Sequence, residues 1–506
     1  MPALRTLRRH RAALLLAALA LVATACGDDS TTASTTTKEA DVTVTTTDRP
    51  DGPAAQIGAE LTGGKGVNVA SPTPPDQVLE AAGYVQHEYT ASGTATSYAP
   101  VGDQGADGRW TVKPTGTADY TTRLVVRRPA KAADASGVVV VEWLNVSGGL
   151  DADPDFQMIH EDITRNGDTW VGVSAQSLGV MGGPVRVSTP QSAAAGAGQG
   201  LRAIDPARYG ELHHPGDDFA YDIFTQVARA VRQGGDPLGG VAPTRLIADG
   251  ESQSAFAMVT YLNAIQPLTK AFDGFLVHSR GGTSLPLVTG GAADIASALA
   301  GKPTIIRTDT SVPVMEVQSE TDVTGILTSL PSRQDDTDTF RLWEMAGTSH
   351  ADTRSVGPLS DQLGCGKIND GPMHLIVKAA YRALVTWIVD GTAPPKAPRL
   401  DVTADDPPKQ ARDHAGIATG GIRTPLVDVP VDVLTGEPGA NAAIVCILSG
   451  QTIPLSDADL AARYADRAQY EARYRAAADA VIKAGFVLDA DRDALMAKAQ
   501  PERIAE

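Results

Sequence analysis

Residues Thr244–Ala264 read TRLIADGESQSAFAMVTYLNA, and they are the strongest indication of the fold. Its first residues predict a strand, and the apolar run that begins at Ala255 predicts a helix. Between them, Gly250, Ser252 and Ser254 place a serine on a tight turn among small residues. A strand, a turn that carries serine and a helix form the context in which the pattern G-x-S-x-G presents a nucleophile. Ser254 replaces the second glycine of that pattern, and a plain turn serine is the alternative interpretation.

The residues on either side continue an alternation of strands and helices. Apolar and β-branched runs predict strands at Tyr120–Arg127, Gly137–Trp143, Thr169–Val173, Thr244–Ala248, Gly274–Val277, Val312–Val317 and Thr339–Met345. Helical spacing occurs in Tyr221–Gln233 and again from Leu375 to Ile388, where Gly391 ends the last core helix. Near-continuous apolar strands separated by helices predict an α/β fold, with a mostly parallel central sheet covered by helices on both faces.

Two segments, 176–218 and 283–310, interrupt this alternation, and we expect insertions there that could form a lid over a pocket. Residues 392–450 are irregular and rich in proline and glycine. Ser456, followed three residues later by an aspartate, predicts the start of a helix that runs to about Gly485. We interpret its tyrosines as core packing. The predicted domains are therefore a core over 51–400 and a helical C-terminal extension over 401–506, packed on that core.

A carboxylate that follows the strand Val312–Val317 is the expected partner of a catalytic histidine, since chains of this kind place serine, acid and histidine in that order. Two candidates are present, Glu320 and Asp322. Asp322 lies where the acid loop usually places its carboxylate, whereas Glu320 is closer to the strand. We favour Asp322 and keep Glu320 as the alternative.

His350 is the predicted general base. It lies in the loop AGTSH directly after the strand Thr339–Met345, 98 residues beyond Ser252 and 28 beyond Asp322. In this position it would take the serine proton and return it to the leaving group. His278 is the rival, but it precedes the acid and is interpreted as a pocket or packing residue. Arg280 could meet an acidic substrate group or form a structural ion pair.

Hydrogen-bond donors for the developing oxyanion are expected at two places. The first is the backbone N–H of Gln253, the residue after the nucleophile. The second is the loop LNVSGG that follows the strand Gly137–Trp143, where Val146 and Asn145 are the candidates. The glycines of that loop allow its backbone to turn toward the site, or simply form a structural turn.

The N-terminus has the pattern of an export signal. Four arginines precede an uncharged apolar run from Ala12 to Ala23, which is too short to span a bilayer. The run ends Ala-Thr-Ala-Cys-Gly, and Cys26 resembles the lipidated cysteine of bacterial lipoproteins, although Ala23 stands where leucine is usual. We predict a signal peptide over 1–25 and lipidation of Cys26. Ordinary cleavage near Ala25, which would leave a secreted protein, is the alternative.

Residues 26–50 are predicted to be a lipidated cysteine and a solvated tether, because Thr31–Pro50 contains nine threonines and no apolar cluster. Removal of residues 1–25 takes away four arginines and no acidic residue, so the formal net charge changes from −17 to −21. An acidic protein of this kind is not expected to bind nucleic acid, and it would meet a membrane only through its lipid. We expect the mature protein on the outer face of the cytoplasmic membrane.

Cys365 and Cys446 remain if Cys26 carries lipid. An exported protein lies in a compartment that permits disulfides, so we predict a bond between them and keep two buried thiols as the alternative. The sequence contains no HExxH, CxxC, P-loop or dinucleotide-binding pattern, and we therefore expect no metal and no cofactor.

Seven segments together resemble a known family. They read EWLNVSGG, VGVSAQS, GESQSA, FDGFLVHSR, QSETDV, GTSH and WIVDGTAPP. They are similar to a bacterial, secreted serine hydrolase subgroup of the α/β-hydrolase-domain family with a G-E-S-Q-S nucleophile elbow. The resemblance extends from about residue 55 to the C-terminus. It implies an α/β-hydrolase fold and a carboxylesterase-like enzyme with a Ser-acid-His triad and no cofactor.

The predicted function is therefore that of an exported serine hydrolase, which cleaves a small-molecule carboxylic ester through an acyl-enzyme. An amidase, peptidase or lactamase would use the same triad, and the sequence does not separate these reactions. A non-catalytic, surface-binding lipoprotein of this fold is an alternative from another class. The presence of serine, acid and histidine in order argues against it.

Overall fold

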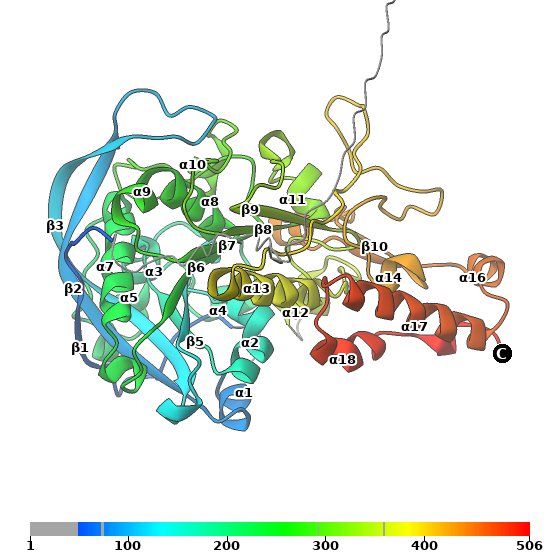
Figure 1. Cartoon of the computed structure of the whole chain (residues 1–506), viewed down its shortest axis with the longest axis horizontal. Coiled ribbons are helices and arrows are strands. Elements are labelled where there is room, and N and C mark those ends of the chain that lie inside the picture. The colour runs from blue at the N-terminus through cyan, green and yellow to red at the C-terminus, as the bar shows by residue number, and fades with distance from the viewer. Residues whose placement is uncertain (1–48, 72–74, 292, 358–359) are drawn as a thin grey trace, which may run out of the picture. The chain divides into compact units, whose positions relative to one another are not determined.

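The computed structural model describes residues 49–71, 75–291, 293–357 and 360–506 (Figure 1). The predicted signal peptide, Cys26 and nearly all of the predicted tether lie outside these ranges. Residues Thr46–Glu506 form one compact unit, to which both the predicted core and the predicted extension belong. In the described ranges, no helix has both the length and the apolar character that a membrane span requires.

Nine strands of the described chain form one sheet, in the order β1-β2-β3-β5-β4-β6-β7-β8-β9 (Figure 1). The six strands from β5 to β9 in this order are mutually parallel, and β1, β2 and β3 add an antiparallel edge. The predicted mostly parallel sheet is thus confirmed. The strands are β1 (Gln56–Glu60), β2 (Tyr84–Pro100), β3 (Val112–Pro129), β4 (Val138–Trp143), β5 (Thr169–Val173), β6 (Arg245–Glu251), β7 (Gly274–His278), β8 (Val314–Ser319) and β9 (Phe340–Met345).

The long hairpin of β2 and β3 differs most from the predicted strands. The sequence predicts only Tyr120–Arg127, whereas β3 runs from Val112 to Pro129 and pairs with β2 over almost its whole length. The β2 sequence YVQHEYTASGTATSYAP is rich in small and polar residues, because this strand is only partly buried. Small polar residues give a weak strand signal, and the pairing with β3 provides the missing stabilisation.

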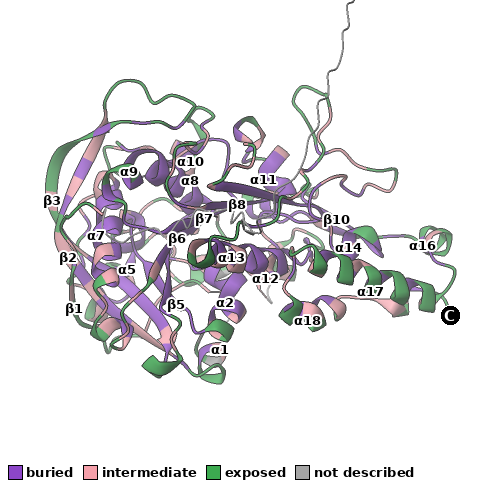
Figure 2. Cartoon of the chain, viewed as in Figure 1, coloured by how far each residue is buried: buried purple, intermediate pink, exposed green. Residues whose placement is uncertain are grey.

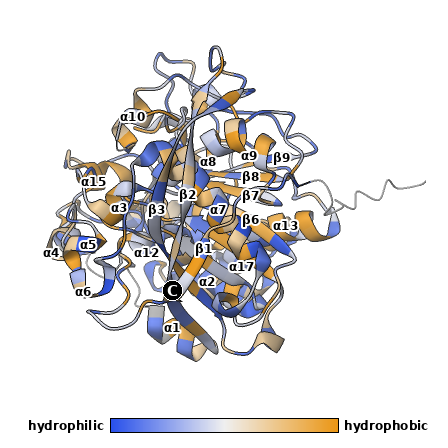
Figure 3. Cartoon of the chain, turned by 90° about the vertical axis from the view of Figure 1, so that its left-hand side faces the viewer, coloured by the Kyte–Doolittle hydropathy of each residue, from blue (hydrophilic) through white to orange (hydrophobic). Residues whose placement is uncertain are grey.

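Helices cover both faces of the sheet, as predicted. On one face lie α2 (Pro154–Asn166) and α13 (Met373–Asp390), and on the other lie α7 (Ala220–Gln233) and α8 (Gln253–Thr260). Strand β4 has the alternation that this requires: Val138 and Val140 pack toward α2 and α13, whereas Val139, Val141 and Trp143 pack toward α7 and α8. The central strands β4, β6 and β7 are buried except at Arg245, the first residue of β6 (Figure 2). Strands β6 and β7 and much of α13 carry apolar residues (Figure 3).

Apart from α17 (Arg467–Lys483) in the C-terminal extension, the remaining described helices are short. Gly391, with φ of 76°, ends α13 at the predicted position. The helix after Ser252 continues through a π-helical turn, Tyr261–Ile265, into α9. The short helices are α1 (Pro75–Ala81), α3 (Ser177–Met181), α4 (Pro190–Ala194), α5 (Leu201–Ile204), α6 (Pro206–Tyr209), α9 (Gln266–Thr269), α10 (Ile295–Leu299), α11 (Glu320–Thr324), α12 (Thr353–Val356), α14 (Pro425–Asp428), α15 (Ile444–Leu448) and α18 (Arg492–Met496).

The single helix predicted from Ser456 to Gly485 is wrong, because the structure has two helices there. Ser456 caps the first, α16 (Asp457–Arg463), as its position suggested. Tyr464 then leaves the helix with an extended backbone, and the Asp466 side chain accepts from Gln469 N to cap α17 (Arg467–Lys483). Aspartate is a good N-cap, and a new cap inside an apolar repeat divides the helix.

The C-terminal extension packs on the edge of the sheet. Its own hairpin, β10 (Asp432–Thr435) with β11 (Gln451–Pro454), is antiparallel. Ile422 N–H donates to Glu344 O, and Ile422 O accepts from Ala346 N–H, so the extension covers part of the exposed edge of β9. Its tyrosines are core residues, as interpreted: the buried set is Tyr464, Tyr470 and Tyr474.

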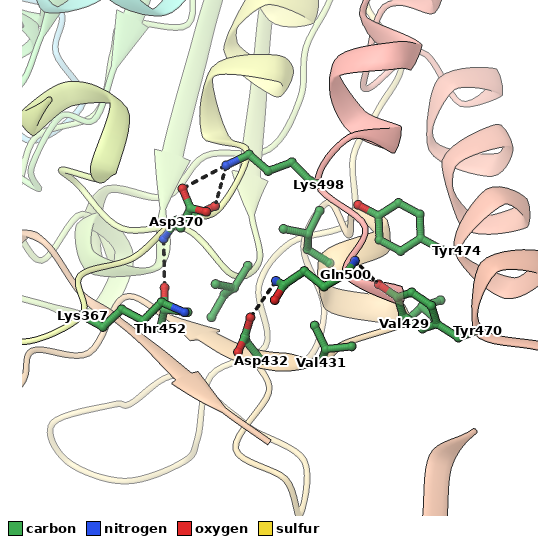
Figure 4. A pocket seen from close by; sticks show the side chains of 12 residues that line it. Lys367, Asp370, Val429, Val431, Asp432, Thr452, Tyr470, Tyr474, Lys498 and Gln500 are labelled. Atoms are coloured by element: carbon green, nitrogen blue, oxygen red, sulfur yellow. Dashed lines mark hydrogen bonds and ion pairs between the residues drawn. The ribbon is translucent and has the colours of Figure 1, made fainter. Parts of the chain in front are cut away.

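Polar contacts hold the seam between the extension and the core (Figure 4). Lys498 Nζ lies 2.9 Å from Asp370 Oδ1, and Asp370 N–H donates to Thr452 Oγ1 over 3.0 Å. Within the extension itself, Gln500 Nε2 donates to Asp432 Oδ2 over 2.9 Å. The cavity among these residues measures about 30 Å³, which is room for one water molecule and not for a substrate.

Candidate active site

Ser252 occupies the turn between β6 and α8 in a strained backbone conformation. Its φ is 56° and its ψ is −120°, a region that non-glycine residues rarely adopt. A Cβ atom on Gly250 would lie 2.9 Å from the backbone carbon and oxygen of Ser254, so only glycine fits at position 250. Ser254 itself is accommodated, which explains why the second glycine of the pattern can be replaced.

Ser252, His350 and Asp322 form a continuous hydrogen-bonded chain. Ser252 Oγ lies 2.9 Å from His350 Nε2, and His350 Nδ1 lies 2.7 Å from Asp322 Oδ1. Nδ1–H donates to the carboxylate, so Nε2 carries the lone pair that accepts the serine proton. The structure therefore brings together the three residues that the sequence pointed to, each just beyond the end of a parallel strand: Ser252 after β6, Asp322 in α11 after β8, and His350 after β9.

Asp322 is held as an ionised acceptor. Its Oδ2 accepts from Ser319 N–H over 2.6 Å and from Ser279 Oγ over 2.8 Å. Burial would raise the pKa of this carboxyl, but His350 and the Ser319 donors lower it more, so that its pKa lies below the ordinary value. Burial lowers the pKa of His350, and the carboxylates of Asp322 and Glu251 more than offset this, which leaves it above the ordinary value.

Glu320 is not in contact with His350. Its Oε1 accepts from Gly347 N–H over 2.6 Å, and its Oε2 accepts from Gly436 N–H over 3.0 Å and from Arg412 Nη2 over 2.8 Å. Glu320 thus joins the loop before His350 to the C-terminal extension. Of the two acids that the sequence left open, only Asp322 reaches the imidazole.

Of the three candidate oxyanion donors, two have a backbone N–H that is free among the described residues, and one does not. In the described part of the chain, neither Gln253 N–H, at the start of α8, nor Val146 N–H has an acceptor. Asn145 N–H donates to Ala152 O over 3.0 Å, so its backbone is already engaged and the prediction for that residue is wrong. The Asn145 side chain instead donates to Glu251, with Nδ2 at 3.0 Å from the backbone oxygen and 3.2 Å from Oε2.

The serine opens into a cavity of about 580 Å³. This volume is within the range of small-molecule sites. Its described lining contains neither lysine nor arginine, and Glu251 and His350 are its ionisable side chains. The apolar part of the wall is Val69, Ala70, Leu150, Ala152, Pro154, Val187, Ala195, Ala351, Val356, Val445 and Leu448.

One of the two expected insertions borders this cavity. Val187, Thr189, Ser192 and Ala195 come from 176–218 and form part of its wall. The segment 283–310 contributes no lining residue among those described. Its Ala293 O instead accepts hydrogen bonds from the side-chain amides of Gln176 and Gln253.

His278 and Arg280 are structural. His278 Nδ1 lies 2.7 Å from Asp155 Oδ1 within the core, and its backbone oxygen accepts from Ser252 N–H over 3.0 Å. Arg280 is fully buried, donates to Thr304 O over 2.7 Å and lies 3.7 Å from Glu316. Neither side chain lines the cavity, so Arg280 does not meet a substrate group.

The C-terminal extension contributes a wall of the cavity that the sequence did not predict. Val445 and Leu448 belong to α15, and Ala351 N–H, next to His350, donates to Leu448 O over 2.9 Å. Cys446, on the same helix, is bonded to Cys365. The disulfide thus ties α15 to the core beside the cavity.

We expect loss of this disulfide to lower the free energy of unfolding by about 2–4 kcal/mol, because the bond closes a long loop. The sequence separation of the two cysteines is 81 residues. The double variant Cys365→Ser with Cys446→Ser and the native protein with its disulfide reduced should unfold at the same lower denaturant concentration. Equal midpoints for the oxidised native protein and the double variant would contradict this expectation.

Glu251, next to the nucleophile, is a residue of the site that the sequence motifs do not single out. Its Oε1 lies 3.3 Å from His350 Nε2, and its side chain lines the cavity. Its position in the sequence could have indicated this, because a residue next to the turn serine at a strand end must lie close to the site. In the described ranges, no three histidine, cysteine or acidic side chains are grouped so that they could hold a metal ion.

Solved structures give weak likenesses. A thermostable esterase from Pseudomonas putida is 16% identical with a TM-score of 0.29, and the match covers 61% of this chain and 88% of that one. An α/β serine hydrolase without a lid from Xanthomonas campestris is 15% identical with a TM-score of 0.27, covering 54% and 91%. A fungal esterase from Rhizomucor miehei is 12% identical with a TM-score of 0.28, covering 62% and 89%. These likenesses carry no argument about what the chain does.

Sequence comparison is more informative. No curated protein matches the chain. The model of a protein family described as "Alpha/beta hydrolase domain" matches residues 47–497, which includes the C-terminal extension. This match agrees with the strand order and with the family resemblance seen in the sequence. The chain belongs to the alpha/beta hydrolase domain family.

Proposed function

We propose that this hydrolase is a serine esterase that cleaves uncharged carboxylic esters through an acyl-enzyme. The observation that carries the proposal is the hydrogen-bonded chain from Ser252 through His350 to Asp322, with the serine on a strained turn that lines a cavity. A nucleophile, a base in contact with it and an acid that orients the base are the parts that nucleophilic acyl transfer requires.

In the first half of the reaction, Ser252 Oγ attacks the ester carbonyl carbon while its proton moves to His350 Nε2. Asp322 stabilises the imidazolium through Nδ1, and the proton then passes to the departing alkoxide. In the second half, a water molecule gives its proton to Nε2 and attacks the acyl carbon. The bond from that carbon to Ser252 Oγ breaks, Nε2 returns the proton to Oγ, and the carboxylic acid is released. We assign the oxyanion donors to Val146 N–H and Gln253 N–H, because these two groups have no acceptor in the described part of the chain.

The lining of the cavity supports an uncharged acyl group. Among the described lining residues there is no cation to neutralise a carboxylate or phosphate on the substrate, and Glu251 would repel one. The apolar wall offers burial to an alkyl or aryl chain, at about 0.8 kcal/mol for each methylene removed from water. Amide and lactam hydrolysis by the same residues are outcomes that the substrate test below would reveal.

A panel of p-nitrophenyl esters tests the proposal. The value of kcat/KM should rise with acyl length by about fourfold per methylene until the cavity is filled. Leu448→Trp fills space beside α15, so it should lower kcat/KM for the longer esters and change that for the acetate much less.

Leu268→Trp is the matched control, because this leucine is 45% exposed on the surface. An equal effect of Leu448→Trp on all chain lengths would contradict the placement of the acyl group. Hydrolysis of the matching anilides, and not of the esters, would contradict esterase activity.

We also propose that the protein is exported and anchored to the outer face of the cytoplasmic membrane by a lipid on Cys26. The Cys365–Cys446 bond supports export, because disulfides persist in oxidising compartments. Cells that express the full chain would be labelled with radioactive palmitate. The native protein should take up label and fractionate with membranes, and Cys26→Ser should do neither. Label on Cys26→Ser, or none on the native chain, would contradict the anchor.

A further inference from the structure

Glu251 makes a contact with His350 that a Ser-His-Asp chain does not explain. Its Oε1 lies 3.3 Å from Nε2, the same nitrogen that lies 2.9 Å from Ser252 Oγ. Nδ1–H of His350 is already directed to Asp322, so Nε2 of a neutral imidazole carries a lone pair. A carboxylate oxygen and a lone pair at this distance repel each other. The contact is attractive only when a proton lies on one of the two groups.

The carboxyl of Glu251 is fixed in this place. Asn145 Nδ2 donates to its Oε2 over 3.2 Å and to its backbone oxygen over 3.0 Å, and the residue is only 9% exposed. Its backbone belongs to the end of β6, where it pairs with His278 of β7. A buried acid on a rigid strand, held by an amide from the opposite loop, cannot turn away from Nε2 without breaking these bonds.

We propose that Glu251 is a further catalytic residue: it shares one titratable proton with His350 Nε2, and its carboxylate stabilises the imidazolium that forms when Ser252 attacks. This inference rests on the proposed esterase function. When that shared proton is present, Nε2 is blocked and the enzyme is inactive. When it has left, Glu251 is a carboxylate, His350 is neutral and Ser252 can give its proton to Nε2.

The acylation step then gains a hydrogen bond that exists only after proton transfer. The Ser252 Oγ–H bond breaks, the Oγ–carbon bond forms and the carbonyl electron pair moves to oxygen. The proton reaches Nε2, where Glu251 Oε1 accepts the new N–H. The carbonyl then re-forms, the ester carbon–oxygen bond breaks, and the departing alkoxide takes the proton from Nε2. Glu251 gains and loses nothing over the step. Because the hydrogen bond is absent in the ground state, it lowers the barrier and not merely KM.

The charges around the pair agree with a shared proton. The pKa of Glu251 is raised to about 7, and burial is the largest cause. The nearby Asp155 of α2 and Asp322 of α11 also raise this pKa, whereas His350 and His278 lower it. The carboxylates of Asp322 and Glu251 raise the pKa of His350 against the effect of burial and of His278. Each partner thus favours retention of one proton between them near neutral pH.

The experiment compares Glu251→Gln with the native protein in the pH dependence of kcat/KM for p-nitrophenyl acetate. Glutamine keeps the shape of the side chain and removes its charge. We expect the activity at the plateau to fall by about tenfold, because the imidazolium loses one of two flanking carboxylates. We also expect the acid limb to move to lower pH by about one unit, because His350 then releases its proton more easily.

Glu211→Gln is the matched control, because it removes the same charge from an exposed glutamate. The pH profile of this variant should coincide with that of the native protein. Glu251→Asp, which withdraws the carboxylate by one methylene, should give an intermediate shift. It also decides the question if the glutamine variant does not fold.

A fall in activity with an unmoved acid limb in both variants would overturn the proposal and leave Glu251 a structural role. Absence of hydrolysis by the native protein at every pH would instead refute the esterase function.

Discussion

Replacing Ser252 by alanine is expected to lower kcat for ester hydrolysis by about 10⁴- to 10⁶-fold, because the acyl-enzyme can no longer form. The remaining activity would come from the oxyanion donors and from binding. The measurement is kcat for p-nitrophenyl acetate, with circular dichroism to show that the variant is folded.

Ser254→Ala is the matched control for this variant. Ser254 lies two residues along the chain, and its Oγ is buried with no hydrogen-bond partner in the described residues. Alanine keeps the Cβ atom that packs beside Gly250. We expect this variant to retain most of the activity. Equal losses at the two serines would show that the turn matters for folding and not for chemistry.

Asp322→Asn is expected to lower kcat by about 10⁴-fold, since asparagine can donate to Nδ1 and so favour the wrong tautomer of His350. Glu320→Gln removes the other acid of the same short helix. Its carboxylate faces Gly347, Gly436 and Arg412, so this change should mainly lower stability, by about 1–3 kcal/mol. The loss of kcat for Glu320→Gln should be at least about 100-fold smaller than for Asp322→Asn.

Kinetics and thermal unfolding of both variants separate the two roles. A drop in kcat that is equal for the two acids would contradict the assignment. The same is true of a larger drop for Glu320→Gln than for Asp322→Asn.

The sequence could predict Ser252 and His350 because their signals are local. A strand, a turn of small residues and an apolar helix are contiguous around Ser252. The glycine-containing loop after the last parallel strand leads directly to His350. Parallel strands end at one edge of a sheet, so residues just beyond their ends come together wherever they stand in the chain. The predicted order of parallel strands was therefore the main basis for placing Ser252 and His350 in one site.

The choice between Glu320 and Asp322 needed the structure. The two residues lie two positions apart in the first turn of α11, and neighbours at that spacing point to different sides of a helix. Which side faces His350 depends on the direction in which α11 leaves β8. No local sequence pattern encodes that direction. The side of α11 that carries Glu320 contacts Gly436 and Arg412 of the C-terminal extension.

The role of α15 could not be predicted for a different reason. This helix lies about a hundred residues beyond His350, within an irregular segment, and it reaches the cavity through contacts between distant parts of the chain. The same holds for β2, whose polar sequence becomes a strand only beside β3. Glu251 was predictable in place but not in role, since its contact with Nε2 depends on how the His350 loop returns.

Covalent labelling shows directly whether Ser252 is an activated nucleophile. The purified chain over residues 50–506 would be treated with a fluorophosphonate probe beside its Ser252→Ala variant, and the labelled peptide would be identified by mass spectrometry. We predict one phosphonylated residue in the native protein, Ser252, and no label in the variant. A native protein that stays unlabelled, or a variant that labels equally well, would show that Ser252 is not the nucleophile.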